Sequence, residues 1–180
     1  MVTENKTGYL ILNTGTPDEP SIPALRRYLR EFLSDPDMLD YPSTKAPELS
    51  SGFNVVKNKV ASVLRWMIVN CIVVPFRPAK IQDKYKSIWT EEGSPLLTNT
   101  VKFTEKLKDF VNGNIEIGMR YGNPSIHSAV KNLKSKGTEK IFLVSMFPQY
   151  AEATSGSTFR EIERVLELED YHPELVKIEH

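Results

Sequence analysis

Four short apolar runs alternate along the chain with segments whose apolar residues recur at helical spacing. The runs cover residues 8–13, 115–121, 140–147 and 175–178. The run at 140–147 is almost entirely apolar, as expected for a strand covered on both faces. Strands alternating with helices predict βαβ units. The pattern therefore indicates an α/β fold in which a parallel four-stranded sheet, with its strands in chain order, carries helices on both faces.

The helices between these strands are predicted from capping residues and periodicity. Ser21, Ser94-Pro95 and Asn123-Pro124 are placed as helix starts, and Thr158 with Glu161 forms a capping box for the last helix. Pro75 and Pro78 are expected to break one helix and to begin a shorter one over 78–89. The helix before them has an apolar stripe that by default faces a core and alternatively covers a ligand or a membrane. That stripe comprises Val56, Val60, Val63, Met67, Cys71 and Val74.

Three predicted strands end in polar or glycine-bearing turns, at 13–17, 120–123 and 148–157. Because ligands of such sheets bind beyond the carboxyl ends of the strands, these turns should converge on one cleft. We expect Thr14, Arg120 and Tyr121 to lie near one another there. An arginine at this edge can pair with a carboxylate, and a tyrosine offers a flat face and a hydroxyl. Taken alone, a surface ion pair is the more common role for such an arginine.

Composition excludes several classes of function. Basic and acidic residues both number 23, and this balance argues against a nucleic-acid partner. The single cysteine, Cys71, permits no internal disulfide, which favours a reducing, cytoplasmic compartment. The histidines, at 127, 172 and 180, lie in no metal-ligand spacing, and no G-x-G-x-x-G dinucleotide motif is present.

The segment at 63–76 is the best candidate for membrane contact. Its most apolar part, residues 66–76, is 11 residues long, whereas a spanning helix needs about 17–25 residues. Trp66 stands beside Arg65, a combination typical of a membrane interface. We therefore expect peripheral contact with a membrane and no spanning helix. Residues 1–8 show no targeting signal.

Five stretches resemble the ferrochelatase family in order and spacing, in the form of its protoporphyrin-using branch. They are LNTGTP (12–17), FLSDPDMLDYP (32–42), VVPFRPAKIQDKYKSIWTEEGSPL (73–96), GMRYGNPSIHSAV (118–130) and FPQYAEATSGST (147–158). The resemblance implies that residues 1–180 are the N-terminal α/β domain of a lyase-class metal chelatase. The whole enzyme would insert ferrous iron into protoporphyrin IX to form protohaem, the last step of haem biosynthesis.

The resemblance also implies a division of labour between two similar halves. The family's catalytic histidine and glutamate lie in the C-terminal half, which this chain lacks, so the chain would carry no catalytic residue and no metal ligand. It would be inactive alone, with one wall of the porphyrin cleft. No cofactor is implied, because Fe²⁺ is a substrate.

The resemblance assigns substrate-binding positions as well. Thr14 falls where the family faces the macrocycle, and Arg120 and Tyr121 fall at the pocket floor. The segment at the pocket lip carries Arg77, Lys84, Tyr85 and Ser94. A porphyrin is a wide apolar disc with two propionates, and it needs flat apolar walls with Arg, Lys or hydroxyl donors at one edge.

Three alternatives remain beside this hypothesis. A relative could insert another metal, such as cobalt, into another tetrapyrrole. A naturally short chain could be a tetrapyrrole-binding module without catalysis. A flavodoxin-like domain with no tetrapyrrole ligand would share the same pattern of strands and helices.

Overall fold

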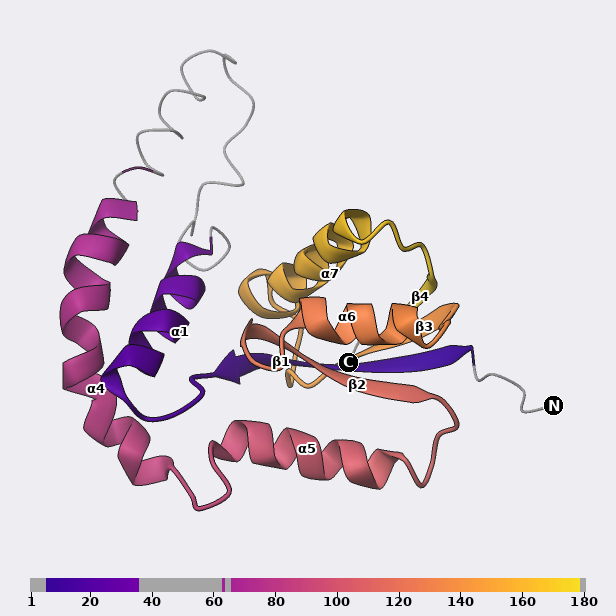
Figure 1. Ribbon diagram of the computed structural model, residues 1–180, viewed down its shortest axis with the longest axis horizontal. Helices are drawn as coiled ribbons and strands as arrows, with labels where there is room; N and C mark the ends of the chain where they lie inside the picture. The colour runs from indigo at the N-terminus through magenta and orange to yellow at the C-terminus, as the bar shows by residue number, and fades with distance from the viewer. Residues whose placement is uncertain (1–5, 36–62, 64–65, 179–180) are drawn as a thin grey trace, which may run out of the picture. The chain divides into compact units, whose positions relative to one another are not determined.

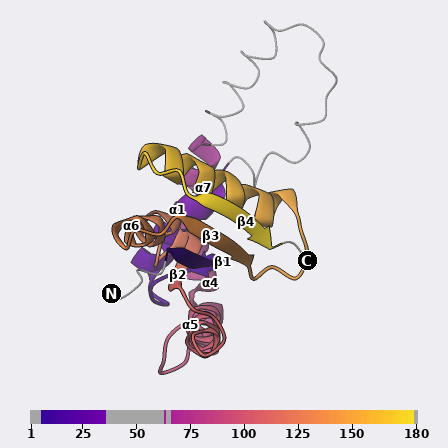
Figure 2. The same cartoon turned by 90° about the vertical axis from the view of Figure 1, so that its right-hand side faces the viewer.

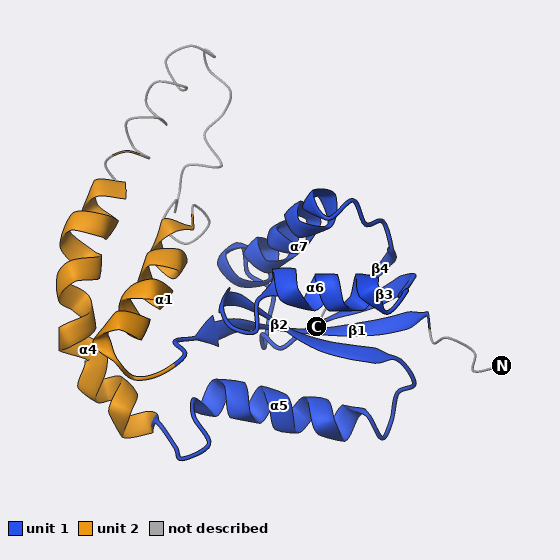
Figure 3. Ribbon diagram, viewed as in Figure 1, with its two compact units in different colours: residues 1–18, 89–180 blue, residues 19–88 orange. Residues whose placement is uncertain are grey.

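The computed structural model describes residues 6–35, 63 and 66–178. They fall into two compact units, one formed by residues 19–88 and the other by residues 1–18 with 89–180 (Figure 3). The unit of residues 1–18 and 89–180 contains the sheet, and we call it the sheet unit. The unit of residues 19–88 contains a pair of helices, and we call it the helical unit.

The sheet has four parallel strands in the order β2-β1-β3-β4. The strands are β1 (Thr7–Thr16), β2 (Asn114–Gly122), β3 (Lys140–Ser145) and β4 (Glu174–Ile178). The predicted parallel α/β fold is confirmed, but the predicted chain order is wrong, because β1 lies inside the sheet. Leu10, Ile11 and Leu12 follow one another in β1 and are each 0% exposed. A strand that is apolar on both faces needs helices on both faces and a neighbouring strand on each side. The chain therefore crosses from β2 on one side of β1 to β3 on the other.

Helices cover both faces of the sheet, as predicted (Figure 1). On one face, α6 (Ile126–Ser135) and α7 (Ser157–Leu168) bury the main core against the strands. On the other face, α5 (Pro95–Leu107) packs against β1 and β2. The main core comprises Leu10, Leu12, Ile126, Ala129, Val130, Leu133, Ile141, Leu143, Phe159, Ile162, Val165 and Leu166.

The face of α5 that packs on the sheet is made of threonines. Thr100 and Thr104 are its buried residues, 3% and 5% exposed. Each hydroxyl donates to the carbonyl four residues earlier, at 2.8 Å, so the polar atoms are satisfied within the helix. Threonine is small, which lets the helix axis approach the strands closely.

Serines begin two of the helices, and the other expected starts need correction. Ser21 caps α1 (Ile22–Ser34) as predicted, accepting from the Ala24 amide at 3.3 Å. Helix α6 is capped by Ser125, which accepts from the Ser128 amide, and not by Asn123-Pro124. The predicted Thr158–Glu161 capping box is also wrong. A π-helical turn, Glu152–Gly156 (η3), leads into α7, and the Thr158 hydroxyl donates to the Thr154 carbonyl.

The helical unit pairs α1 with α4 (Val74–Ile88), and a π-helical turn, Ile68–Val73 (η2), runs directly into α4. Pro75 and Pro78 therefore do not break the helix, contrary to the prediction. Both prolines follow the π-helical turn, and the change from π to α hydrogen bonding falls in the same stretch as Pro75.

The predicted apolar stripe is only partly a core. Val74 is buried, whereas Met67, Cys71 and Val63 are exposed; Val56 and Val60 lie outside the described residues. Of the helices that the structure describes, none is long and apolar enough to cross a membrane.

Candidate functional site

The carboxyl ends of β1 and β2 bring three of the predicted site residues together. The register pairs Asn13 with Met119 and Gly15 with Tyr121, so Thr14 lies beside Arg120 and Tyr121, as expected from the sequence. Thr14 is half-buried, and its amide donates to the Asn13 side-chain oxygen at 2.8 Å. Thr14 therefore lies within β1, next to the strand's carboxyl end, and the Asn13 side chain holds its amide.

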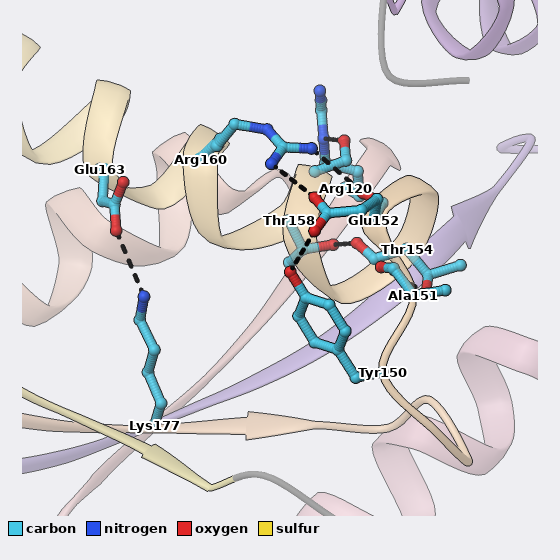
Figure 4. Close-up of polar contacts among 10 residues, drawn as sticks. Arg120, Tyr150, Ala151, Glu152, Thr154, Thr158, Arg160, Glu163 and Lys177 are labelled. Atoms are coloured by element: carbon cyan, nitrogen blue, oxygen red, sulfur yellow. Dashed lines mark hydrogen bonds and ion pairs between the residues drawn. The ribbon is translucent and has the colours of Figure 1, made fainter. Parts of the chain in front are cut away.

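Arg120 is fixed in orientation by two contacts. Its Nε donates to the Ser157 hydroxyl at 2.8 Å, and its Cζ lies 4.7 Å from the centroid of the Tyr121 ring. Ser157, the first residue of α7, is fully buried. Figure 4 shows Arg120 beside the start of this helix. A guanidinium held against an aromatic ring keeps a fixed donor geometry, which suits recognition of a carboxylate.

Hydroxyl and amide groups line the rest of this edge. The Asn13 amide nitrogen donates to the Thr100 hydroxyl at 3.2 Å, which ties β1 to α5. At the end of β3, the Ser145 and Ser155 hydroxyls lie 3.4 Å apart and are buried. The edge is therefore a row of polar side chains above an apolar core.

Ser94 occupies the N-cap position of α5 without capping it. Its side chain is buried, and its hydroxyl accepts from the Thr16 hydroxyl at 2.8 Å. The capping role predicted for Ser94 is therefore wrong, because the hydroxyl turns toward β1 and not toward the helix amides. Its contact with a ligand stays a prediction.

Comparison with known proteins identifies the family. The sequence model of the ferrochelatase family matches residues 6–180. The chain belongs to the ferrochelatase family. Proteins named ferrochelatase from Coxiella burnetii (strain Dugway 5J108-111) and Actinobacillus pleuropneumoniae (serotype 5b) are each 39% identical to it, over 160 and 168 residues. The one from Chromobacterium violaceum is 38% identical over 181 residues.

These ferrochelatases are much longer than this chain. The matches cover 88%, 90% and 97% of the chain but only 40%, 46% and 44% of the three relatives, in the same order. The chain thus spans less than half the length of the curated relatives it matches.

The other three predicted residues lie on α4, in the helical unit. Arg77, Lys84 and Tyr85 are spaced i, i+7 and i+8, which places them on one face of the helix. Burial raises the pKa of the Tyr85 hydroxyl, while the nearby charge of Arg77 opposes that rise. Tyr28 of α1, which is buried, is a second phenol whose pKa is raised, first by burial and then by the half-buried Tyr85. Both phenols stay neutral at physiological pH.

The described residues offer donors and flat surfaces more than reactive groups. Within the described ranges, no cluster of three or more His, Cys, Asp or Glu could hold a metal ion. His127 contacts Glu169 at 2.6 Å, His172 contacts Asp170 at 3.2 Å, and His180 lies outside the described residues. The edge of the sheet can therefore hold a ligand, but it supplies no histidine base.

A shallow hollow of about 390 Å³ lies beside α7 and the end of β4 (Figure 4). Its charges are paired: Arg160 contacts Glu152 at 3.1 Å and Lys177 contacts Glu163 at 3.3 Å. Its walls therefore carry no net charge that would select an ion. It is lined by Tyr150, Gly156, Phe159, Arg160, Glu163 and Lys177.

Sequence reasoning did not single out Asn13 or Ser145 as site residues. Asn13 ends the first apolar run and Ser145 is the polar residue within the third, and those positions were the available signal. Their partners, Thr100 and Ser155, are distant in sequence or lie in another element, so the contacts themselves could not be read from the chain.

Proposed function

We propose that this chain forms one wall of the porphyrin cleft of a ferrochelatase that inserts Fe²⁺ into protoporphyrin IX to give protohaem. The observation that carries the proposal is Arg120. In a member of this family, it stands at the carboxyl edge of the sheet, anchored to Ser157 and stacked on Tyr121. That edge is where ligands of parallel α/β sheets bind.

The chemistry of a porphyrin fits such a wall. The guanidinium of Arg120 pairs with a propionate, and Thr14 beside it contacts the macrocycle. Arg77, Lys84, Tyr85 and Ser94 supply donors and one aromatic face at the lip. Fe²⁺ is a substrate, and the proposed reaction uses no organic cofactor. The histidine and glutamate that handle the pyrrole protons and the metal belong to the other half of the enzyme.

We place the protein in the cytoplasm, in peripheral contact with a membrane through residues 63–76. Six exposed large apolar side chains among the described residues of this segment support the membrane contact, Trp66 and Phe76 being 61% and 65% exposed. Large apolar and aromatic side chains on a helix surface insert into the headgroup region. The other four are Val63, Met67, Ile68 and Ile72.

Titration of the chain with free-base protoporphyrin IX, followed by the Soret band and tryptophan quenching, tests the binding wall. We expect weak binding that Arg120→Gln reduces about tenfold or more, because one charge-assisted hydrogen bond contributes about 1.5–3 kcal/mol. Arg164→Gln is the matched control, since Arg164 is exposed and pairs with Glu161 on the same helix.

Equal affinity of the folded Arg120→Gln variant and the unaltered chain would contradict the assignment. No binding by any form would point instead to a flavodoxin-like domain without a tetrapyrrole ligand. Binding of cobalt-specific tetrapyrroles in preference to protoporphyrin IX would favour a chelatase for another metal.

A further inference from the structure

The two faces of the sheet are covered unequally. The face that carries Leu10, Leu12 and Ile141 is buried by α6 and α7 across its width. On the opposite face, α5 packs on β1 and β2, and Figure 2 shows it beneath those two strands. In the described part of the sheet unit, no helix covers that face over β3 and β4.

The uncovered area is apolar. We call it the open sheet face, and strand alternation places on it Tyr9 of β1, two residues of β3, Met146 directly after β3, and two residues of β4. Tyr9 and Phe142 stack with their ring centroids 5.3 Å apart. The residues are Tyr9, Phe142, Val144, Met146, Val176 and Ile178, each half-buried except Ile178, which is 41% exposed.

The residue pattern of β4 favours a partner that covers this face. Its side chains toward α7 are Leu175 and Lys177, whereas those on the open sheet face are Val176 and Ile178. The more apolar side of this edge strand is therefore the one without a helix. Parallel sheets occur almost only with both faces covered.

We infer that the open sheet face is the docking site of an amphipathic helix from the C-terminal half of the ferrochelatase. This inference rests on the proposed function, since it takes that half as the partner. Two observations favour this occupant. The relatives carry more than half of their length outside the matched region, which is ample for a covering helix. At one end of the apolar patch Lys140 pairs with Glu174 at 2.7 Å, which sets charged side chains beside it for the polar edge of an amphipathic helix.

In the helical unit, apolar side chains of α1 and α4 are already buried by the pairing of these two helices. Helices α1 and α4 bury Leu25, Leu29 and Val74 within their own pair. The flanks of α5 add apolar surface beside its buried threonines, since Val101 and Phe103 are 40% and 37% exposed.

Photo-cross-linking identifies the occupant. The photoreactive residue benzoylphenylalanine is placed at 144 or 176, and the chain is mixed with the C-terminal half of the Chromobacterium violaceum ferrochelatase. We expect cross-linked peptides from that half, found by mass spectrometry. The same residue at 168 is the control, because Leu168 is 62% exposed on α7, the helix on the other face.

Binding measurements add a second readout. The double variant Val176→Lys and Ile178→Lys should weaken the complex about tenfold or more, as loss of a central apolar anchor does. Leu168→Lys should leave it unchanged, and circular dichroism checks that every variant folds.

Each outcome of these experiments either supports or overturns the docking site. Cross-links to residues 19–88, or to a second copy of the chain, would overturn the inference, as would no complex or a complex that the double variant leaves intact. Zinc insertion into protoporphyrin, measured on the same mixtures, separates the two proposals. A complex that depends on the open sheet face but inserts no metal would keep this inference and reject the proposed function.

Discussion

Gly15 lies where the backbone of β1 leaves no room for a side chain beside β2. Its φ is +100°, and a Cβ built there would lie 1.8 Å from the Tyr121 carbonyl oxygen. Gly93 has a similar φ of +106° but no atom within 4 Å of the same position. The two glycines therefore separate the cost of an unusual φ from the cost of a collision.

We predict that Gly15→Ala destabilises the protein much more than Gly93→Ala. Both changes incur the backbone strain, about 1–3 kcal/mol. Only Gly15→Ala must also force β1 away from β2 at the edge that carries Thr14 and Arg120. Urea unfolding of the two variants gives the comparison, and equal losses of unfolding free energy would contradict the reported geometry.

At the scale of single residues, the sequence predicts where an element begins better than it predicts which groups a side chain contacts. Serine before proline is a strong helix start, and α5 does begin at Pro95. Whether the Ser94 hydroxyl caps that helix or bonds to Thr16 depends on where β1 lies, 78 positions earlier. Local pattern carries no information on that choice.

At the scale of elements, α6 and the end of α7 are joined by the His127–Glu169 contact. The hydrogen bond from His127 is the main cause that holds the pKa of Glu169 below its ordinary value of 4.5, and Lys131 and Lys134 also contribute. A lowered pKa in the folded state means that the contact stabilises the fold fully above the ordinary pKa. That stabilisation is lost as pH falls through the lowered value.

We therefore predict that Glu169→Gln flattens the fall of Tm between about pH 5 and pH 3, and that His127→Gln does the same by removing the main cause. Glu167→Gln is the control, as an exposed glutamate on the same helix. Tm measured across this range by circular dichroism is the test. Profiles for Glu169→Gln and Glu167→Gln that coincide would show that the contact has no role in acid stability.

The segment 63–76 carries a second prediction at this scale. The chain should co-sediment with liposomes, and the double change Trp66→Ser and Met67→Ser should reduce the bound fraction. Both side chains are exposed, 61% and 44%, so their loss costs membrane contact and little of the core. Phe110→Ser is a suitable control, because Phe110 is 83% exposed but lies outside the segment. Unchanged sedimentation of the double variant would argue against the segment as the membrane contact.

The elements show where prediction from pattern succeeds and where it fails. Period and caps predict all four strands and the start of α1, because those signals are local. Pro75 and Pro78 were read as breaks because proline lacks an N–H. The π-helical turn before α4, which no local pattern indicates, makes room for them.

The order of strands is a property of the whole molecule, and the sequence alone predicted it wrongly. Alternating strands and helices fit several orders of a parallel sheet equally well. The order β2-β1-β3-β4 depends on which side of β1 each crossover returns to. The clue in the sequence that this strand is internal was its run of consecutive apolar residues, which the structure shows to be buried.

The last prediction concerns the whole enzyme. Residues 1–180 alone should bind protoporphyrin weakly and insert no metal, because a disc with one face covered gains only part of the apolar contact. Metal insertion also needs a base for the pyrrole protons and ligands that pass on the metal. The described residues hold no metal-binding cluster, and the site edge has no histidine.

Adding the C-terminal half of a relative, fused or in trans, should restore anaerobic insertion of zinc or iron, followed by absorbance. The chain with Arg120→Gln in the same fusion should insert metal more slowly at low porphyrin concentration, while Arg164→Gln should not. Insertion by residues 1–180 alone, at a rate near that of the fusion, would show that the catalytic groups lie in this half.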